Sequence, residues 1–265
     1  MQDISWFTAG DGARIAYRFD GAANLPTLVL ANSIGTTLHM WDAQIPALIR
    51  HFRVLRYDYR GHGASSVPQG PYSLDRLGRD VLELMDGLGI ERAHFLGLSL
   101  GGIVGQWLGV HAPQRVGRLI LSNTSAYLGP TPQWDERIAA TLRADDMSET
   151  AETFLKNWFP ASWLQDGNST IEPFRAVLLN TDKHGLASAF AAVRDFDLRR
   201  TIVLIPNPTL VIAGQHDTVT AASHGEQIAA AIPGAKLLTL PAVHLTNVEL
   251  PDAFEEAVLS FLLEA

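Results

Sequence analysis

The sequence predicts an α/β protein with a mostly parallel, doubly wound sheet of eight strands and a helical cap inserted between two core strands. Three observations support this fold class. Short apolar runs alternate with segments of helical periodicity along most of the 265 residues, a length that suits one large domain. The alternation stops over residues 126–206 and then resumes. We therefore expect a core domain of residues 1–125 and 207–265 and a cap of residues 126–206.

Eight segments have the pattern of strands. Residues 4–20 hold two alternating runs around a Gly-Asp-Gly turn, which predicts an antiparallel hairpin at the sheet edge. The other six segments are nearly continuous apolar runs, as expected for parallel strands that helices cover on both faces. They lie at residues 27–32, 52–58, 93–98, 118–124, 209–214 and 235–240.

Helical periodicity appears between these strands. Apolar residues recur on one face of residues 73–88, with Ser73 as the expected N-cap, and residues 253–262 repeat this pattern. A third helix is expected at residues 100–111. The inserted segment is also helical in pattern and contains no convincing core strand. Because ligands of open α/β sheets bind at the carboxyl ends of the strands, an insertion of about 80 residues there would enclose a pocket.

Composition excludes several classes of function. The chain has no cysteine, which excludes disulfides, thiolate zinc sites, iron–sulfur clusters and a cysteine nucleophile. Its net charge of −8 argues against a nucleic-acid partner and means that an anionic ligand would need a local cationic patch. No apolar run is long enough to span a membrane, and the N-terminus lacks the pattern of a signal peptide. We expect a cytoplasmic protein; whether it forms a homo-oligomer is left open.

The strongest motif is Gly-Leu-Ser-Leu-Gly at residues 97–101, between a predicted strand and a predicted helix. A serine on such a sharp turn is held in a strained conformation that exposes its hydroxyl group. The residues two before and two after it must be very small, because their side chains would collide with the turn. Gly102 and Gly105 extend this small face toward the sheet. The motif predicts Ser99 as a nucleophile.

A serine hydroxyl needs a base, and the base needs a carboxylate to orient it. His244 follows the last core strand, and Asp217 follows the strand at 209–214. The order Ser99, Asp217, His244 is the one found in α/β hydrolases. Alternatively, Asp217 caps the next helix and His244 is a surface-loop histidine. A metal site at Asp217 has no supporting ligand spacing, so we expect no metal.

Two backbone amides are expected to stabilise the negative oxygen that forms when a nucleophile attacks an ester carbonyl. The first is the amide of Leu100, at the start of a helix, where N–H groups have no intrahelical partner. The second is the amide of Ile34, in the loop after the strand at 27–32.

Segments along nearly the whole chain resemble the 3-oxoadipate enol-lactonases, which have the α/β-hydrolase fold. Many hydrolases of this fold carry His-Gly where this chain has Asn32 and Ser33, and this departure favours the narrower family. Two of the segments, at residues 134–138 and 194–199, lie in the predicted cap. The others lie at residues 32–36, 40–44, 57–63, 97–102, 121–124 and 244–249.

The resemblance implies hydrolysis of 3-oxoadipate enol-lactone to 3-oxoadipate, a step in the bacterial breakdown of protocatechuate and catechol, through an acyl-enzyme on Ser99. It implies no metal and no organic cofactor. Since the substrate carries a carboxylate, the pocket should hold a donor for it. Arg137 and Trp134 in the cap are candidates, with Arg194 behind them.

Other functions remain open within and beyond this fold. A general carboxylesterase, a cofactor-free perhydrolase or a hydrolase of C–C bonds would use the same three residues. A dehalogenase or epoxide hydrolase is disfavoured because those enzymes use an aspartate nucleophile and this motif carries Ser99. From a different class, the chain could be a catalytically silent protein that binds a small molecule.

Overall fold

The computed structural model describes residues 3–165 and 168–264. It contains an eight-stranded sheet in the order β1-β2-β4-β3-β5-β6-β7-β8. The strands β1 and β2 pair antiparallel with their neighbours, and all other pairs are parallel. This confirms the predicted fold class. The strands are β1 (Ser5–Thr8), β2 (Arg14–Asp20), β3 (Thr27–Ala31), β4 (Arg53–Tyr57), β5 (Ala93–Leu98), β6 (Val116–Ser122), β7 (Thr209–Gly214) and β8 (Lys236–Leu240).

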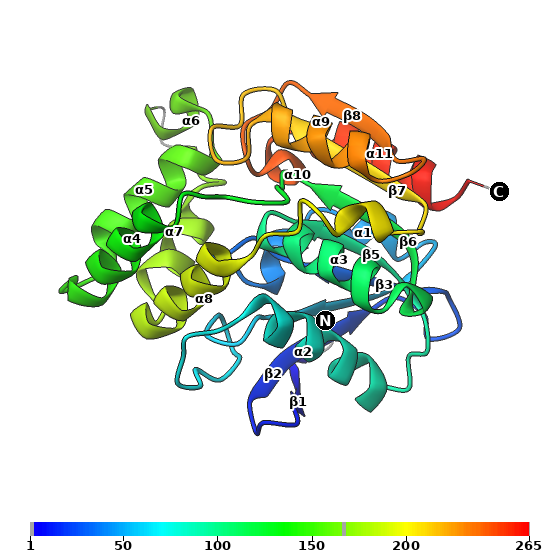
Figure 1. Ribbon diagram of the computed structural model, residues 1–265, viewed down its shortest axis with the longest axis horizontal. Coiled ribbons are helices and arrows are strands. Elements are labelled where there is room, and N and C mark those ends of the chain that lie inside the picture. The colour runs from blue at the N-terminus through cyan, green and yellow to red at the C-terminus, as the bar shows by residue number, and fades with distance from the viewer. Residues whose placement is uncertain (1–2, 166–167, 265) are drawn as a thin grey trace.

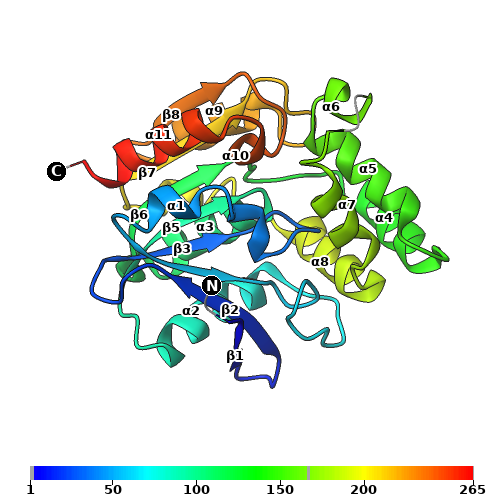
Figure 2. The same ribbon diagram turned by 180° about the vertical axis from the view of Figure 1, so that it is seen from behind.

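Helices cover both faces of this sheet. Figure 1 shows α2, α3 and α9 on the near face, and Figure 2 shows α1 and α11 on the opposite face. The helix predicted at 73–88 is α2, and the Ser73 hydroxyl accepts a hydrogen bond from the Arg76 amide as its N-cap. The core and closing helices are α1 (Ile45–Leu48), α2 (Leu74–Gly87), α3 (Leu100–His111), α9 (Ala222–Ala231), α10 (Thr246–Glu249) and α11 (Pro251–Leu262).

The strand β6 begins and ends two residues earlier than predicted. Asn123, the first residue after it, has a φ of 43°, in the left-handed region that ends a strand. The Thr124 hydroxyl donates to the carbonyl of Ser99, so this residue belongs to the turn and not to the strand. The run of apolar and β-branched residues therefore concealed a turn that belongs to the candidate site.

The helix α3 lies unusually close to the sheet because of its glycines. A methyl group on Gly101 would lie 2.1 Å from the carbonyl oxygen of Ala31 in β3. One on Gly97 would lie 2.1 Å from the carbonyl oxygen of Gly101. Backbone atoms cannot move aside as a flexible side chain can, so only glycine fits at both positions.

Between β6 and β7 the chain forms helices at one end of the sheet, coloured green to yellow in Figure 1. They are α4 (Thr131–Arg143), α5 (Ser148–Trp158), α6 (Ala161–Gln165), α7 (Glu172–Leu179) and α8 (Lys183–Asp195). Aromatic rings fill the space between them: Phe190 of α8 lies 5.7 Å from Trp134 and 6.1 Å from Phe154, centroid to centroid. Such packing makes these helices a compact group with its own apolar interior.

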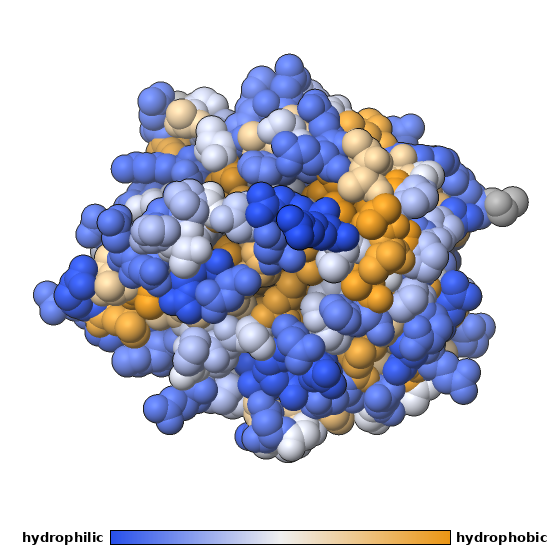
Figure 3. Space-filling view, viewed as in Figure 1, coloured by the Kyte–Doolittle hydropathy of each residue, from blue (hydrophilic) through white to orange (hydrophobic). Residues whose placement is uncertain are grey.

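Hydrophilic side chains cover most of the face seen in Figure 3. Hydrophobic side chains gather where the short turn η3 (Ile202–Leu204) lies, and Val203 and Leu204 are exposed there. None of the helices among the described residues is both long and apolar enough to span a membrane.

Candidate active site

Ser99 lies at the turn between β5 and α3 with φ 59° and ψ −115°. For a residue with a side chain this left-handed backbone is strained, and it persists only where neighbouring groups hold it. The Ser99 amide donates to the Ser122 carbonyl at 2.9 Å, and its carbonyl accepts from the Thr124 hydroxyl at 2.8 Å. Both anchors come from the end of β6, so the adjacent strand fixes the turn.

His244 and Asp217 form a buried hydrogen bond of 2.8 Å between Nδ1 and Oδ2. An ionised carboxylate only accepts hydrogen bonds, so Nδ1 carries the proton in this bond, and in the neutral imidazole the lone pair is then on Nε2. Burial alone would raise the pKa of Asp217. The charge of His244 and hydrogen bonds from His244, Thr220 and Asn123 outweigh burial and hold the pKa below its ordinary value.

The Asp217 carboxylate has four further hydrogen bonds. Oδ1 accepts from the backbone amides of Val219 and Thr220 at 2.8 and 2.9 Å. Oδ2 accepts from the Thr220 hydroxyl at 2.8 Å and from Nδ2 of Asn123 at 3.0 Å. With both oxygens occupied, the carboxylate is fixed in ionised form and in one orientation.

Asn123 and Thr220 were not foreseen as parts of this site. Asn123 joins three segments, because its Nδ2 also donates to the Val243 carbonyl and its Oδ1 accepts from the hydroxyls of Ser122 and Thr246. A signal for Asn123 was present in the sequence: a polar residue directly after a strand lying between the serine strand and the aspartate strand. Thr220 gave no such signal, since a threonine three residues after an aspartate is common in loops.

Ser99 and His244 line one small inner cavity of about 40 Å³. Leu100 and Ile34 line it too, and within residues 3–165 and 168–264 neither of their amides donates to a protein acceptor. The loops after β3, β5, β7 and β8 all leave the sheet at the carboxyl ends of parallel strands, which explains their convergence. The cavity is otherwise lined by Ile103, Leu128, Trp134, Arg137, Phe154, Asn157, Trp158, Phe190, Val193 and Val219.

Asn32, at the position where related folds often carry histidine, holds the Ile34 loop. Its Nδ2 donates to the Tyr57 carbonyl at 2.8 Å, and its Oδ1 accepts from the indole of Trp41 at 2.9 Å. Its backbone carbonyl accepts from the amide of Gly101 in α3. Asn32 therefore links the loop of one expected amide donor to the helix of the other.

Arg137, on α4, reaches the inner cavity with its charge unpaired. Its guanidinium lies 4.6 Å from the ring centroid of Phe190 and 5.1 Å from that of Phe154. No carboxylate among the described residues lies within ion-pair distance of it. Burial lowers its pKa, yet arginine stays protonated in proteins. A desolvated cation held only by aromatic faces attracts an anion strongly.

Trp134 lines the same cavity, but its polar group is already used. The indole N–H donates to the Leu128 carbonyl at 2.5 Å, and the ring packs on Phe190. Trp134 therefore presents an aromatic surface to the cavity rather than a hydrogen-bond donor.

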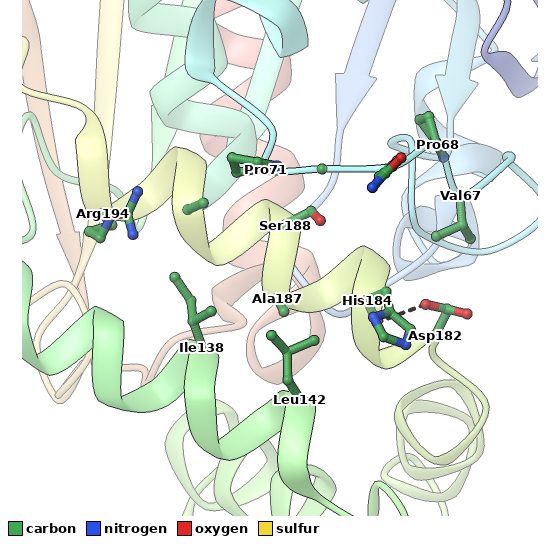
Figure 4. A pocket seen from close by; sticks show the side chains of 13 residues that line it. Val67, Pro68, Pro71, Ile138, Leu142, Asp182, His184, Ala187, Ser188 and Arg194 are labelled. Carbon is green, nitrogen blue, oxygen red and sulfur yellow. Dashed lines mark hydrogen bonds between the residues drawn. The ribbon is translucent and has the colours of Figure 1, made fainter.

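Arg194 does not join this cavity. Its guanidinium is ion-paired with Asp135 and Asp195 at 2.8 and 2.7 Å. It lines a separate, larger cavity of about 630 Å³ between α4, α8 and the loop of residues 67–71 (Figure 4). Neither Ser99 nor His244 lines that cavity. The charge of Arg194 is neutralised on the other side of α8, so it is not available to a ligand beside Ser99.

An outer pocket of about 510 Å³ adjoins the inner cavity and shares five lining residues with it. Over the part of the chain that the structure describes, no aspartate or glutamate lines either space. This is notable in a chain with a net charge of −8. Both spaces therefore favour an anionic ligand, although the net charge of the whole protein would repel one. Among residues 3–165 and 168–264, no group of three or more histidine, aspartate or glutamate side chains is arranged so that it could hold a metal ion.

Comparison with known proteins assigns this fold to a class. The family model of the alpha/beta hydrolase fold matches residues 26–250, and the chain belongs to this family. The chain is 40% identical to 3-oxoadipate enol-lactonase 2 of Acinetobacter baylyi over 95% of its length and 93% of the relative's. It is 30% identical to a putative carbamate hydrolase of Agrobacterium fabrum, over 92% and 95% of the two chains.

Two solved structures are also similar. A hydrolase from Pseudomonas aeruginosa is 69% identical, with a TM-score of 0.98 and 99% of each chain covered. The enol-lactonase from Burkholderia xenovorans is 42% identical, with a TM-score of 0.95 over 98% of this chain and 100% of the other. The resemblance to enol-lactonases is thereby confirmed, and the chain is a hydrolase that these relatives place among the carboxylic ester hydrolases.

Proposed function

We propose that this protein hydrolyses 3-oxoadipate enol-lactone to 3-oxoadipate, with Ser99 as nucleophile, His244 as general base and acid, and Asp217 as the group that orients His244. The observation that carries the substrate assignment is the unpaired guanidinium of Arg137, which lines one cavity with Ser99 and His244. An ester substrate that carries a carboxylate fits this cavity in two ways, because Ser99 can attack its ester group and Arg137 can bind its carboxylate. Enol-lactonases among its relatives support the same assignment.

Acylation opens the lactone ring. The Ser99 hydroxyl oxygen attacks the lactone carbonyl carbon while Nε2 of His244 takes the hydroxyl proton. The carbonyl oxygen becomes negative and accepts hydrogen bonds from the amides of Leu100 and Ile34. The ring C–O bond then breaks. Its oxygen leaves as an enolate, which is more stable than an alkoxide, and takes the proton from His244. The opened chain stays attached to Ser99 as an ester.

Deacylation uses the same groups in reverse. Nε2 of His244 takes a proton from water, and the hydroxide adds to the ester carbon on Ser99. The Ser99 oxygen leaves with the proton from His244, which releases the new carboxyl group. The enol end of the product rearranges to the ketone. Asp217 stabilises the imidazolium in both halves, and its low pKa keeps it ionised throughout.

The helices of residues 126–206 act in this proposal as a cap domain over the core of residues 1–125 and 207–265. They supply Arg137 and the aromatic wall of the cavity, and they exclude bulk water from the acyl-enzyme. In a water-poor cavity the attraction between Arg137 and a carboxylate is stronger than at the surface.

A second candidate function is carbamate hydrolysis, which the 30%-identical relative favours. The deciding experiment measures kcat/KM side by side on the enol-lactone, a neutral aryl ester, an aryl carbamate and peracid formation. We expect the enol-lactone to be preferred by at least about a hundredfold, as specificity for a charged group allows. Preference for the carbamate, the neutral ester or peracid formation would overturn the assignment.

Arg137→Gln tests the observation on which the substrate assignment depends. It should raise KM for the enol-lactone by about tenfold or more, the loss expected for one charge-assisted hydrogen bond. The KM for a neutral aryl ester should change far less, because that substrate has no carboxylate to bind. Arg194→Gln is the matched control, since Arg194 is ion-paired outside this cavity. Equal changes for both substrates would remove Arg137 from this role.

A further inference from the structure

The inner cavity is too small for a substrate as it stands. Ligand pockets usually measure about 300–1,000 Å³, whereas this one measures about 40 Å³. The outer pocket, by contrast, measures about 510 Å³. A six-carbon lactone therefore enters only if the wall between the two spaces rearranges. This shared wall consists of Leu128, Trp134, Arg137, Asn157 and Val219.

Only two side chains of the shared wall can offer a polar group to a ligand. Leu128 and Val219 are apolar, and the indole N–H of Trp134 is bonded to the Leu128 carbonyl. Arg137 and Asn157 remain. The side-chain amide of Asn157, half-buried on α5, forms no hydrogen bond with any residue that the structure describes. A half-buried amide without a protein partner is suited to binding a ligand or solvent.

The position of Asn157 is tied to the catalytic segment. Its neighbour Trp158 is 1% exposed and packs against Phe154 at 4.9 Å between ring centroids. The Trp158 carbonyl accepts from the amide of Leu245, the residue directly after His244. The end of α5 is therefore anchored to the loop that carries His244, which fixes the position of Asn157 in the wall of the cavity that Ser99 and His244 line.

We propose that Asn157 is a specificity-determining residue, whose side-chain amide donates to the same substrate carboxylate that Arg137 binds. This rests on the proposed function. A carboxylate has two oxygens and several lone pairs, so it accepts from a guanidinium and an amide together. The neutrality of Asn157 matters equally. An aspartate at this position would add a negative charge to the wall that also holds Arg137 and would weaken the attraction for a carboxylate, whereas asparagine has nearly the same shape and adds no charge.

The test uses two substrates that differ only in a terminal carboxylate: p-nitrophenyl butyrate, which is neutral, and mono-p-nitrophenyl glutarate, which is anionic. Both esters release the same chromophore, so one assay measures both rates. Neither ester is the enol-lactone, so the test does not require that the enol-lactone be the natural substrate. The quantity measured is the ratio of kcat/KM for the anionic ester to that for the neutral one. Asn157→Asp should lower this ratio by about tenfold or more, and Asn157→Leu by several-fold.

Asn180→Asp is the matched control. It makes the same change at the end of α7, where the Asn180 amide donates to the Ala176 carbonyl away from both spaces, and it should leave the ratio unchanged. A ratio that stays at the wild-type value in both Asn157 variants overturns the proposal, including the case in which kcat/KM falls equally for both esters. Asn157→Leu keeps the test decisive if the aspartate variant does not fold.

The two proposals fail in different ways. If Arg137→Gln collapses the ratio and both Asn157 variants keep it, Arg137 alone binds the carboxylate and only the inference about Asn157 fails. If Arg137→Gln also leaves the ratio unchanged, the carboxylate site itself is absent and the proposed substrate class fails with it.

Discussion

At the scale of single residues, the proposed chemistry depends on a few side chains that many others hold in place. Ser99 has strained backbone angles that the end of β6 maintains through two hydrogen bonds. Asp217 accepts five hydrogen bonds, and His244 is 1% exposed. Such preorganisation means that the reacting groups need little rearrangement when substrate arrives.

Replacing Ser99 by alanine should lower kcat by about three to six orders of magnitude, as in other hydrolases with this arrangement. Folding should be preserved because alanine is smaller than serine. A fluorophosphonate should label the wild-type protein and not the variant. Ser188→Ala, in the separate cavity of Figure 4, serves as control and should keep both activity and labelling. A loss of only a few-fold in Ser99→Ala would contradict the nucleophilic role.

Asn123→Ala tests the residue that joins β6, Asp217 and Val243. Asn123 donates to the Asp217 carboxylate and helps to lower its pKa, so its removal should raise that pKa. We expect kcat to fall about tenfold, because the carboxylate that orients His244 loses one of its five hydrogen bonds. Loss of the buried hydrogen bonds should also destabilise the fold by about 1–3 kcal/mol. An unchanged kcat would show that Asn123 does not act through Asp217; Asn180→Ala is the control.

At the scale of elements, the contact between α3 and β3 decides where the serine lies. The amide of Gly101 donates to the Asn32 carbonyl, and a methyl group at Gly101 would collide with the Ala31 carbonyl. The distance between helix and strand therefore sets the distance between the Leu100 and Ile34 amides. Small residues in α3 are thus a geometric requirement of the proposed oxyanion site.

Gly101→Ala should accordingly displace α3 from β3. We expect a loss of more than about 3 kcal/mol in the free energy of unfolding, or failure to fold, since overpacking against backbone is costly. Gly109→Ala in the same helix is the control. Its nearest contacts are Ile205 side-chain carbons 3.0 Å away, which can shift. Similar unfolding midpoints for the two variants in urea would contradict this account.

At the scale of the whole molecule, buried histidine links stability to pH. His62 is 3% exposed, and burial lowers its pKa to about 4. In an unfolded chain the pKa of an imidazole is about 6.5. Between these two values the unfolded chain binds a proton that the folded protein does not. The stability that neutral His62 contributes is therefore fully present above a pH of about 6.5, and it is lost as the pH falls toward the pKa of the folded protein, about 4.

The free energy of unfolding should fall by up to about 3 kcal/mol as the pH drops from about 6.5 to about 4. His62→Gln should flatten the pH dependence over that range, because glutamine does not titrate. Urea unfolding at a series of pH values measures this directly, and an equal slope in wild type and His62→Gln would refute it.

Much of the fold could be predicted because periodicity is a local property. The strands β5 and β7 and the helix α3 have the predicted bounds, since each is an apolar run ended by glycine, serine or histidine at a turn. The predicted end of β6 was wrong, because Asn123 adopts a left-handed turn and its side chain bonds to Asp217 and to the Val243 carbonyl. Those partners lie far away in the sequence.

By itself, the sequence determined the fold class, the serine motif and the order of the three proposed catalytic residues, because these depend on local patterns along the chain. Only the tertiary structure decided which cap cations are available. Arg137 and Arg194 each lie near acidic residues in the cap sequence, yet one lies unpaired in the cavity of Ser99 and the other is neutralised by Asp135 and Asp195. The reason is physical: a side chain's charge is available only if no opposite charge lies near it, and that depends on how the helices pack.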